Sequence, residues 1–150
     1  RRAAALACGR AAEPHRLERA PHLLRFIAPL LGDSDPVVRR AVGSSLGTLL
    51  GAYPEPAFEA LIGWSTSCDP NVLRNVAAAF AAEPAAGLAK RALIVLRKLA
   101  LDERHAVWRA TATATWQLGR RRPDVVRPEV ERWLEDEARA KVAREALRYL

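Results

Sequence analysis

The chain has 150 residues, half of them hydrophobic, and a formal net charge of +7, and a chain of this size can bury one continuous core. No apolar stretch approaches the roughly 20 residues that span a bilayer, which excludes a membrane-spanning helix. Alanine and leucine dominate, and the charged residues, 27% of the chain, are spread along it. This composition favours amphipathic helices over strands and predicts an all-α protein.

The helices are predicted in chain order from apolar periodicity and from the residues that cap or break them. An opening pair is expected over residues 2–12 and 21–32. Asp35 can cap the next helix and Pro36 fits its first turn, so this helix, here called helix A, runs to about residue 52. Pro54 and Pro56 then restart the chain as a helix B that ends at Trp64. Further A helices are expected over residues 70–82, 104–121 and 138–150, and B helices over 84–101 and 123–136.

A Val-x-Arg triplet recurs every 34 or 35 residues, at Val38/Arg40, Val72/Arg74, Val107/Arg109 and Val142/Arg144. Helix pairs of this length cannot bury both faces alone, so neighbouring pairs must stack. The repeat therefore predicts a right-handed α-solenoid of about four and a half helix pairs. We expect residues 1–150 to form a single domain cut from a longer protein, because the chain lacks methionine and opens within a predicted helix.

The Asp-x-x-Val-Arg opening of helix A, the small residues after it and the proline between A and B resemble HEAT repeats and their armadillo-like relatives. A narrower stretch runs from Val38 through Pro54 to Trp64 and recurs from Val107 through Pro123 to Trp133. It is similar to DNA alkylation-repair proteins of the AlkC and AlkD type. That similarity implies a basic concave surface for duplex DNA and an acidic residue that assists base loss. No catalytic residue can be transferred from it to this chain.

Two functions remain open from the sequence. The first is a non-enzymatic scaffold that binds a protein partner, or neighbouring domains, through the concave surface that B helices line in this architecture. The second is a DNA-binding module of the alkylation-repair, glycosylase-like type. No Walker loop, dinucleotide fingerprint or nucleophile elbow is present, and we predict no catalytic residue, cofactor or metal site.

Basic side chains on predicted helix B and at the next helix end are the candidate partner-binding residues. The helix over 84–101 carries four of them at spacings of seven, which predicts a basic inner stripe. Three consecutive arginines before Pro123 suit either a solvated helix end or contact with an anionic partner. The full candidate set is Lys90, Arg91, Arg97, Lys98, Arg120, Arg121, Arg122 and Arg127.

The triplet arginines Arg40, Arg74, Arg109 and Arg144 occupy one position in successive units and should form a ladder. We expect them to pair with acids such as Asp35 and Asp69, and a series of phosphate contacts is the alternative. Among the tryptophans, Trp64 and Trp133 are expected to pack between repeats, and Trp108 to be less buried.

Cys8 and Cys68 lie far apart in the sequence, each without a second cysteine nearby. This excludes a CxxC redox pair and a zinc knuckle. Reduced, buried thiols are typical of intracellular proteins, so we expect a cytoplasmic setting.

Overall fold

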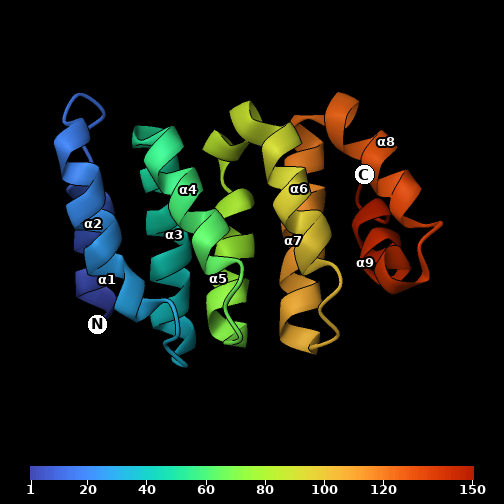
Figure 1. The fold of residues 1–150 in the computed structure, drawn as a ribbon, viewed down its shortest axis with the longest axis horizontal. Coiled ribbons are helices and arrows are strands. Elements are labelled where there is room, and N and C mark those ends of the chain that lie inside the picture. The colour runs from blue at the N-terminus through green and yellow to red at the C-terminus, as the bar shows by residue number, and fades with distance from the viewer.

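The computed structural model describes all 150 residues, which form nine α-helices and no strand. The helices stack in chain order along the long axis of the molecule, from the N-terminus at one end to the C-terminus at the other (Figure 1). Their bounds are α1 (Arg2–Arg10), α2 (Ala20–Ile27), α3 (Pro36–Ala52), α4 (Pro54–Trp64), α5 (Pro70–Phe80), α6 (Ala89–Leu99), α7 (His105–Arg121), α8 (Pro123–Trp133) and α9 (Glu137–Leu147).

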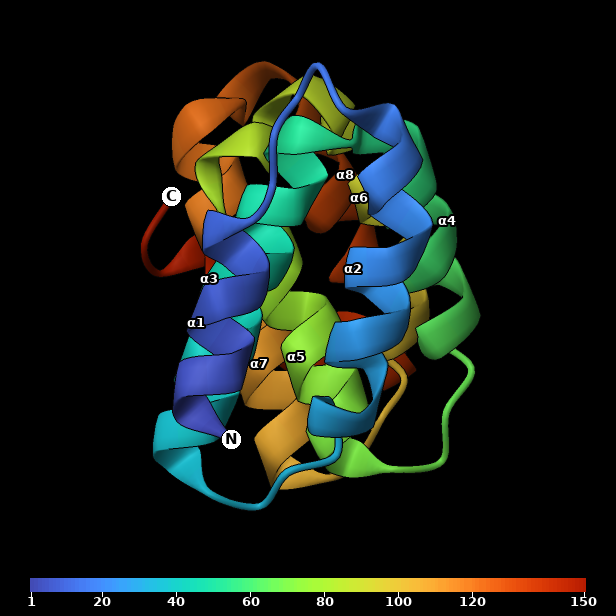
Figure 2. The same ribbon diagram turned by 90° about the vertical axis from the view of Figure 1, so that its left-hand side faces the viewer.

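The helices form two layers, as the view along the stack shows (Figure 2). The odd-helix layer holds α1, α3, α5, α7 and α9, and the even-helix layer holds α2, α4, α6 and α8. Forty buried residues form one apolar cluster that runs from α1 to α9. This architecture is the predicted α-solenoid of four helix pairs and one further helix. None of the nine helices combines the length and the hydropathy that a membrane span requires.

Most predicted helix ends agree with the observed ones, because the caps act locally. Asp35 and Asp69 cap α3 and α5, and a proline follows each in the first turn. The expected helix over 84–101 differs, since residues Glu83–Leu88 form a 3-10 segment and α6 begins only at Ala89. Pro84 and Gly87 explain the difference, because neither favours the interior of an α-helix.

Glycines let the odd helices approach one another closely. Gly43, Gly47 and Gly51 lie four residues apart on α3, facing Ala78, Ala82 and Pro84. A Cβ atom built on Gly47 would lie only 2.5 Å from the Cβ of Ala82. Ala78 belongs to α5, whereas Ala82 and Pro84 follow it, so glycines allow α3 to approach both α5 and the segment directly after it.

The two layers differ in how closely their helices pack. Adjacent odd helices contact one another along much of their length, whereas adjacent even helices touch at few points and α4 hardly touches α6. The closer spacing of the odd helices favours that layer for the inner side of the stack, whereas the predicted B helices are the even ones. Which layer binds a partner stays a prediction.

Candidate partner-binding surface

The odd-helix layer is rich in arginine and nearly free of acid. Helices α1, α3, α5 and α7 contain no Asp or Glu, and α9 contains only Glu137 and Glu145. The eight arginines of the four acid-free helices are Arg2, Arg10, Arg39, Arg40, Arg74, Arg109, Arg120 and Arg121.

The interior odd helices have only one side that no other element covers, and their exposed arginines lie there. An interior odd helix such as α5 packs against an odd helix on each flank and against the even layer. Its remaining accessible residues therefore share a single face. On α3 this face carries Val37, Arg40, Ser44 and Thr48, all exposed and spaced three or four residues apart. We call the combined surface the odd-helix face.

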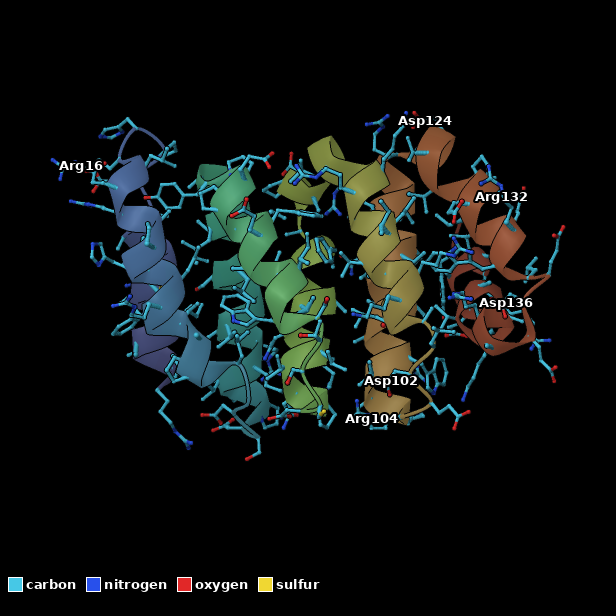
Figure 3. The ribbon with its side chains drawn as sticks, in the orientation of Figure 1. Arg16, Asp102, Arg104, Asp124, Arg132 and Asp136 are labelled. Atoms are coloured by element: carbon cyan, nitrogen blue, oxygen red, sulfur yellow. The ribbon has the colours of Figure 1, made fainter.

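The aspartates of the chain lie instead at or near the ends of helices. The carboxylates of Asp35, Asp69 and Asp136 accept hydrogen bonds from the backbone amides two residues later, at 2.7, 2.8 and 3.1 Å. Asp102 and Arg104 lie together at one end of the helices, and Asp124 lies at the opposite end (Figure 3). Hydrogen bonds from Arg104, 2.6 Å at the shortest, hold the pKa of Asp102 below its usual value.

The expected pairing of the arginine ladder with Asp35 and Asp69 is wrong. Both carboxylates cap their own helices. No ladder arginine, whether Arg40, Arg74, Arg109 or Arg144, forms an ion pair. Asp35 and Asp69 accept hydrogen bonds from the free backbone amides at the start of their own helices, because these amides lie closer to them than any ladder arginine. The ladder charges are therefore left without acidic partners.

A hollow of about 490 Å³ opens on the odd-helix face over α5. Its polar lining is Arg39, Arg40 and Ser44 from α3, Arg74 and Asn75 from α5, and Gln117 from α7. Its apolar lining consists of the short side chains of Ala78, Ala81, Ala82 and Ala110. The hollow exists because small side chains on and after α5 lie between longer ones on the two flanking helices.

The charges in this hollow repel one another. Burial and the nearby charge of Arg39 lower the pKa of Arg74. Sequence reasoning identified Arg40 and Arg74 as ladder residues but missed Arg39, Ser44 and Gln117. The signal that could have found this surface is the lack of acids in residues 36–52, 70–80 and 105–121.

The predicted basic stripe on α6 is present but interrupted. Lys90, Arg97 and Lys98 are exposed. Arg91 instead donates hydrogen bonds of 2.7 and 3.0 Å to the two carboxylate oxygens of Glu55 on α4, with its guanidinium carbon 4.2 Å from the centre of the Phe58 ring. This contact raises the pKa of Arg91 and lowers that of Glu55. The even layer is thus a mixture of both charges, and its role in binding stays a prediction.

The other candidate arginines are partly held by contacts within the chain. Arg121 donates to the backbone oxygen of Ala81 at 2.8 Å, and Arg122 forms an ion pair with Asp124, also at 2.8 Å. Arg127 donates to the backbone oxygen of Leu150. Of the three consecutive arginines only Arg120 has no hydrogen-bonded partner, and it lies over the Trp116 ring at 5.7 Å.

The tryptophans differ in burial from what was expected. Trp133 is buried as predicted, and Trp64 is only half-buried. Trp108 was expected to be less buried, but it is 9% exposed, because Lys141 of α9 covers its ring at 4.1 Å. Trp116 and Tyr149 form a pair with ring centres 5.5 Å apart, beside Arg120 on the odd-helix face. Cys8 is buried, which raises the pKa of its thiol, and Cys68 is exposed rather than buried.

Comparison with known proteins gives the phase of the repeat. Residues 23–53 match the model of the HEAT repeat. This HEAT unit covers α2 and then α3, so the odd helices are the second helices of their units. The division predicted from the sequence began each unit at Asp-Pro and is one helix out of phase. With the phase corrected, the second helices are those of the more closely packed odd-helix layer.

A solved structure described as that of an engineered protein, a Northeast Structural Genomics Consortium target, shares the fold. It is similar to this chain with a TM-score of 0.51 and 18% sequence identity over 97% of this chain and 72% of that one. No curated protein matches the chain. Neither of the two matches is to a DNA alkylation-repair protein, so that resemblance stays a prediction.

Proposed function

We propose that this chain is a non-enzymatic α-solenoid scaffold that binds an acidic protein partner along its odd-helix face. The match to a HEAT repeat supports a scaffold, since such repeats typically bind proteins. The proposal differs from the expectation drawn from the sequence in the face that it uses. The partner lies on the helices of the odd layer, and not on α4, α6 and α8.

The observation that carries this proposal is the set of arginines without ion-pair partners on α3, α5 and α7, three helices that contain no acid. A face of one sign attracts partners of the other and speeds their encounter. Arginine also suits this role because its planar fork can hold a carboxylate with two hydrogen bonds. On the even layer, by contrast, the charges of Glu55 and Glu59 on α4 act on Arg91 of α6 and would repel part of an acidic partner.

A pair of matched charge reversals tests which face binds. Arg40→Glu/Arg109→Glu changes two exposed residues of the odd-helix face, and Lys90→Glu/Lys98→Glu changes two exposed residues of α6. Both variants alter the net charge equally. With a fluorescein-labelled polyglutamate peptide as probe, we expect the first variant to weaken binding about tenfold or more in fluorescence anisotropy, and the second far less.

Two outcomes would count against the proposal. Equal losses in both variants would mean that only net charge matters. A loss confined to Lys90→Glu/Lys98→Glu would return the binding surface to the even layer, as first predicted from the sequence.

A nucleic-acid partner is the second candidate, and the aromatic pair on the odd-helix face favours it. Trp116 and Tyr149 lie beside Arg120, and bases stack on aromatic rings that are flanked by basic groups. We expect Tyr149→Ala to weaken the binding of a labelled single-stranded oligonucleotide and not that of polyglutamate. Binding of the oligonucleotide should also fall steeply with salt. If Tyr149→Ala has no effect on either probe, the second candidate loses its support.

A further inference from the structure

The hollow over α5 places three guanidinium groups around one space. Arg39 and Arg40 come from the N-terminal part of α3, and Arg74 comes from the N-terminal part of α5. No acidic side chain forms an ion pair with any of the three. Because Arg74 is half-buried and lies near the charge of Arg39, bringing an anion into the hollow removes an unfavourable interaction that the free protein carries.

Most donors in this hollow are unused. Arg39 donates one hydrogen bond to the backbone oxygen of Ser34. The guanidinium groups of Arg40 and Arg74 form no hydrogen bond within the chain, and neither does the Ser44 hydroxyl or the Gln117 side-chain amide at the edges of the hollow. Each arginine offers up to five N–H donors. The hollow therefore offers many donors and few acceptors, an arrangement suited to an oxyanion with several oxygens.

The number of charges favours a phosphoryl group over a carboxylate. A carboxylate carries one negative charge and two oxygens, which a single arginine can satisfy. A phosphate monoester carries about −1.5 to −2 charges at neutral pH and three acceptor oxygens, enough for three arginines. The volume of about 490 Å³ exceeds that of one phosphate. The alanines of the lining leave room for the side chain that carries it.

We propose that this hollow binds the phosphoryl group of a phosphorylated side chain in the protein partner. The inference rests on the proposed function, because the partner lies on the odd-helix face. A nucleic-acid phosphate fits less well. The three arginines converge on one space instead of following a strand, and no aromatic ring lines the hollow to stack on a base.

The test compares one fluorescein-labelled acidic peptide in three forms, with phosphoserine, serine or glutamate at its centre. We expect the phosphoserine form to bind at least about tenfold more tightly than the other two. One additional hydrogen bond to a charged group is enough to change the Kd by about tenfold. Arg40→Gln and Arg74→Gln, made singly, should remove this preference, and phenyl phosphate should compete with the peptide. Lys98→Gln removes one exposed charge from α6 and serves as the control that keeps the preference.

Each result separates this inference from the proposed function. Equal binding of all three peptides, still lost in Arg40→Glu/Arg109→Glu, would overturn the phosphoryl site and leave the proposed function standing. A preference that survives Arg40→Gln, whose exposed side chain is not needed for folding, would overturn the site even if Arg74→Gln is unstable. Tighter competition by a single-stranded oligonucleotide than by phenyl phosphate, with no preference for phosphoserine, would overturn the site in favour of nucleic acid.

Discussion

Single residues set the distances on which the odd-helix face depends. Gly47 of α3 faces Ala82, which follows α5, and a methyl group has no room there. Gly63 on α4 is the opposite case, since a Cβ added to it would meet nothing within 4 Å. The two glycines have the same helix propensity but different surroundings, which separates the effect of packing from that of the backbone.

Gly47→Ala should lower the free energy of unfolding by about 1–2 kcal/mol. Overpacking of a tight contact costs about 1–3 kcal/mol, and replacing a helical glycine by alanine returns up to about 1 kcal/mol. Gly63→Ala should raise the free energy of unfolding by up to about 1 kcal/mol for the second reason alone. Urea unfolding followed by circular dichroism measures both. Equal stabilisation by the two substitutions would show that α3 and the segment after α5 are not in close contact.

At the scale of the element, the starts of the odd helices explain why the ladder arginines are unpaired. The helix dipole and the free amides at a helix start attract the carboxylates of Asp35, Asp69 and Asp136. Each aspartate is held at the end of its helix, and the charged residues further along α3 and α5 are all arginines. One local rule thus both starts the helix and leaves its outer face positive.

Asp35→Ala should lower the free energy of unfolding by about 1 kcal/mol, the usual cost of losing a helix cap. Asp35→Asn should keep most of the stability, because an amide oxygen can accept the hydrogen bond from the Val37 amide that the carboxylate now accepts at 2.7 Å. Thermal unfolding of the two variants checks this. If asparagine destabilises as much as alanine, the charge of Asp35 matters more than its capping.

At the scale of the whole molecule, stability is distributed along the stack. Each helix pair contacts only the pairs beside it, so interior units are held from both sides and terminal units from one. The terminal helices should therefore open more often than those in the middle.

Hydrogen exchange should show this gradient. Helices α5 and α9 have 11 residues each, and α9 lies at the end of the stack, so we expect its amides to exchange faster than those of α5. Helix α1 should likewise exchange faster than α7. Mass spectrometry of peptides from these four helices measures the rates. Uniform protection across them would mean that the molecule opens only as one cooperative unit.

The sequence by itself determined what local interactions control. The Asp-Pro starts, the helix-breaking prolines and the spacing of apolar residues predicted nearly every helix and the α-solenoid, because each signal acts within a few residues. Only the tertiary structure decided which layer packs more closely, since that depends on contacts between units such as that of Gly43 with Ala78. It also decided which charges are free. Arg91 forms an ion pair with Glu55 on another helix. Arg40 and Arg74 have no ion pair, because Asp35 and Asp69 cap their own helices. The spacing of residues along the chain reveals neither outcome.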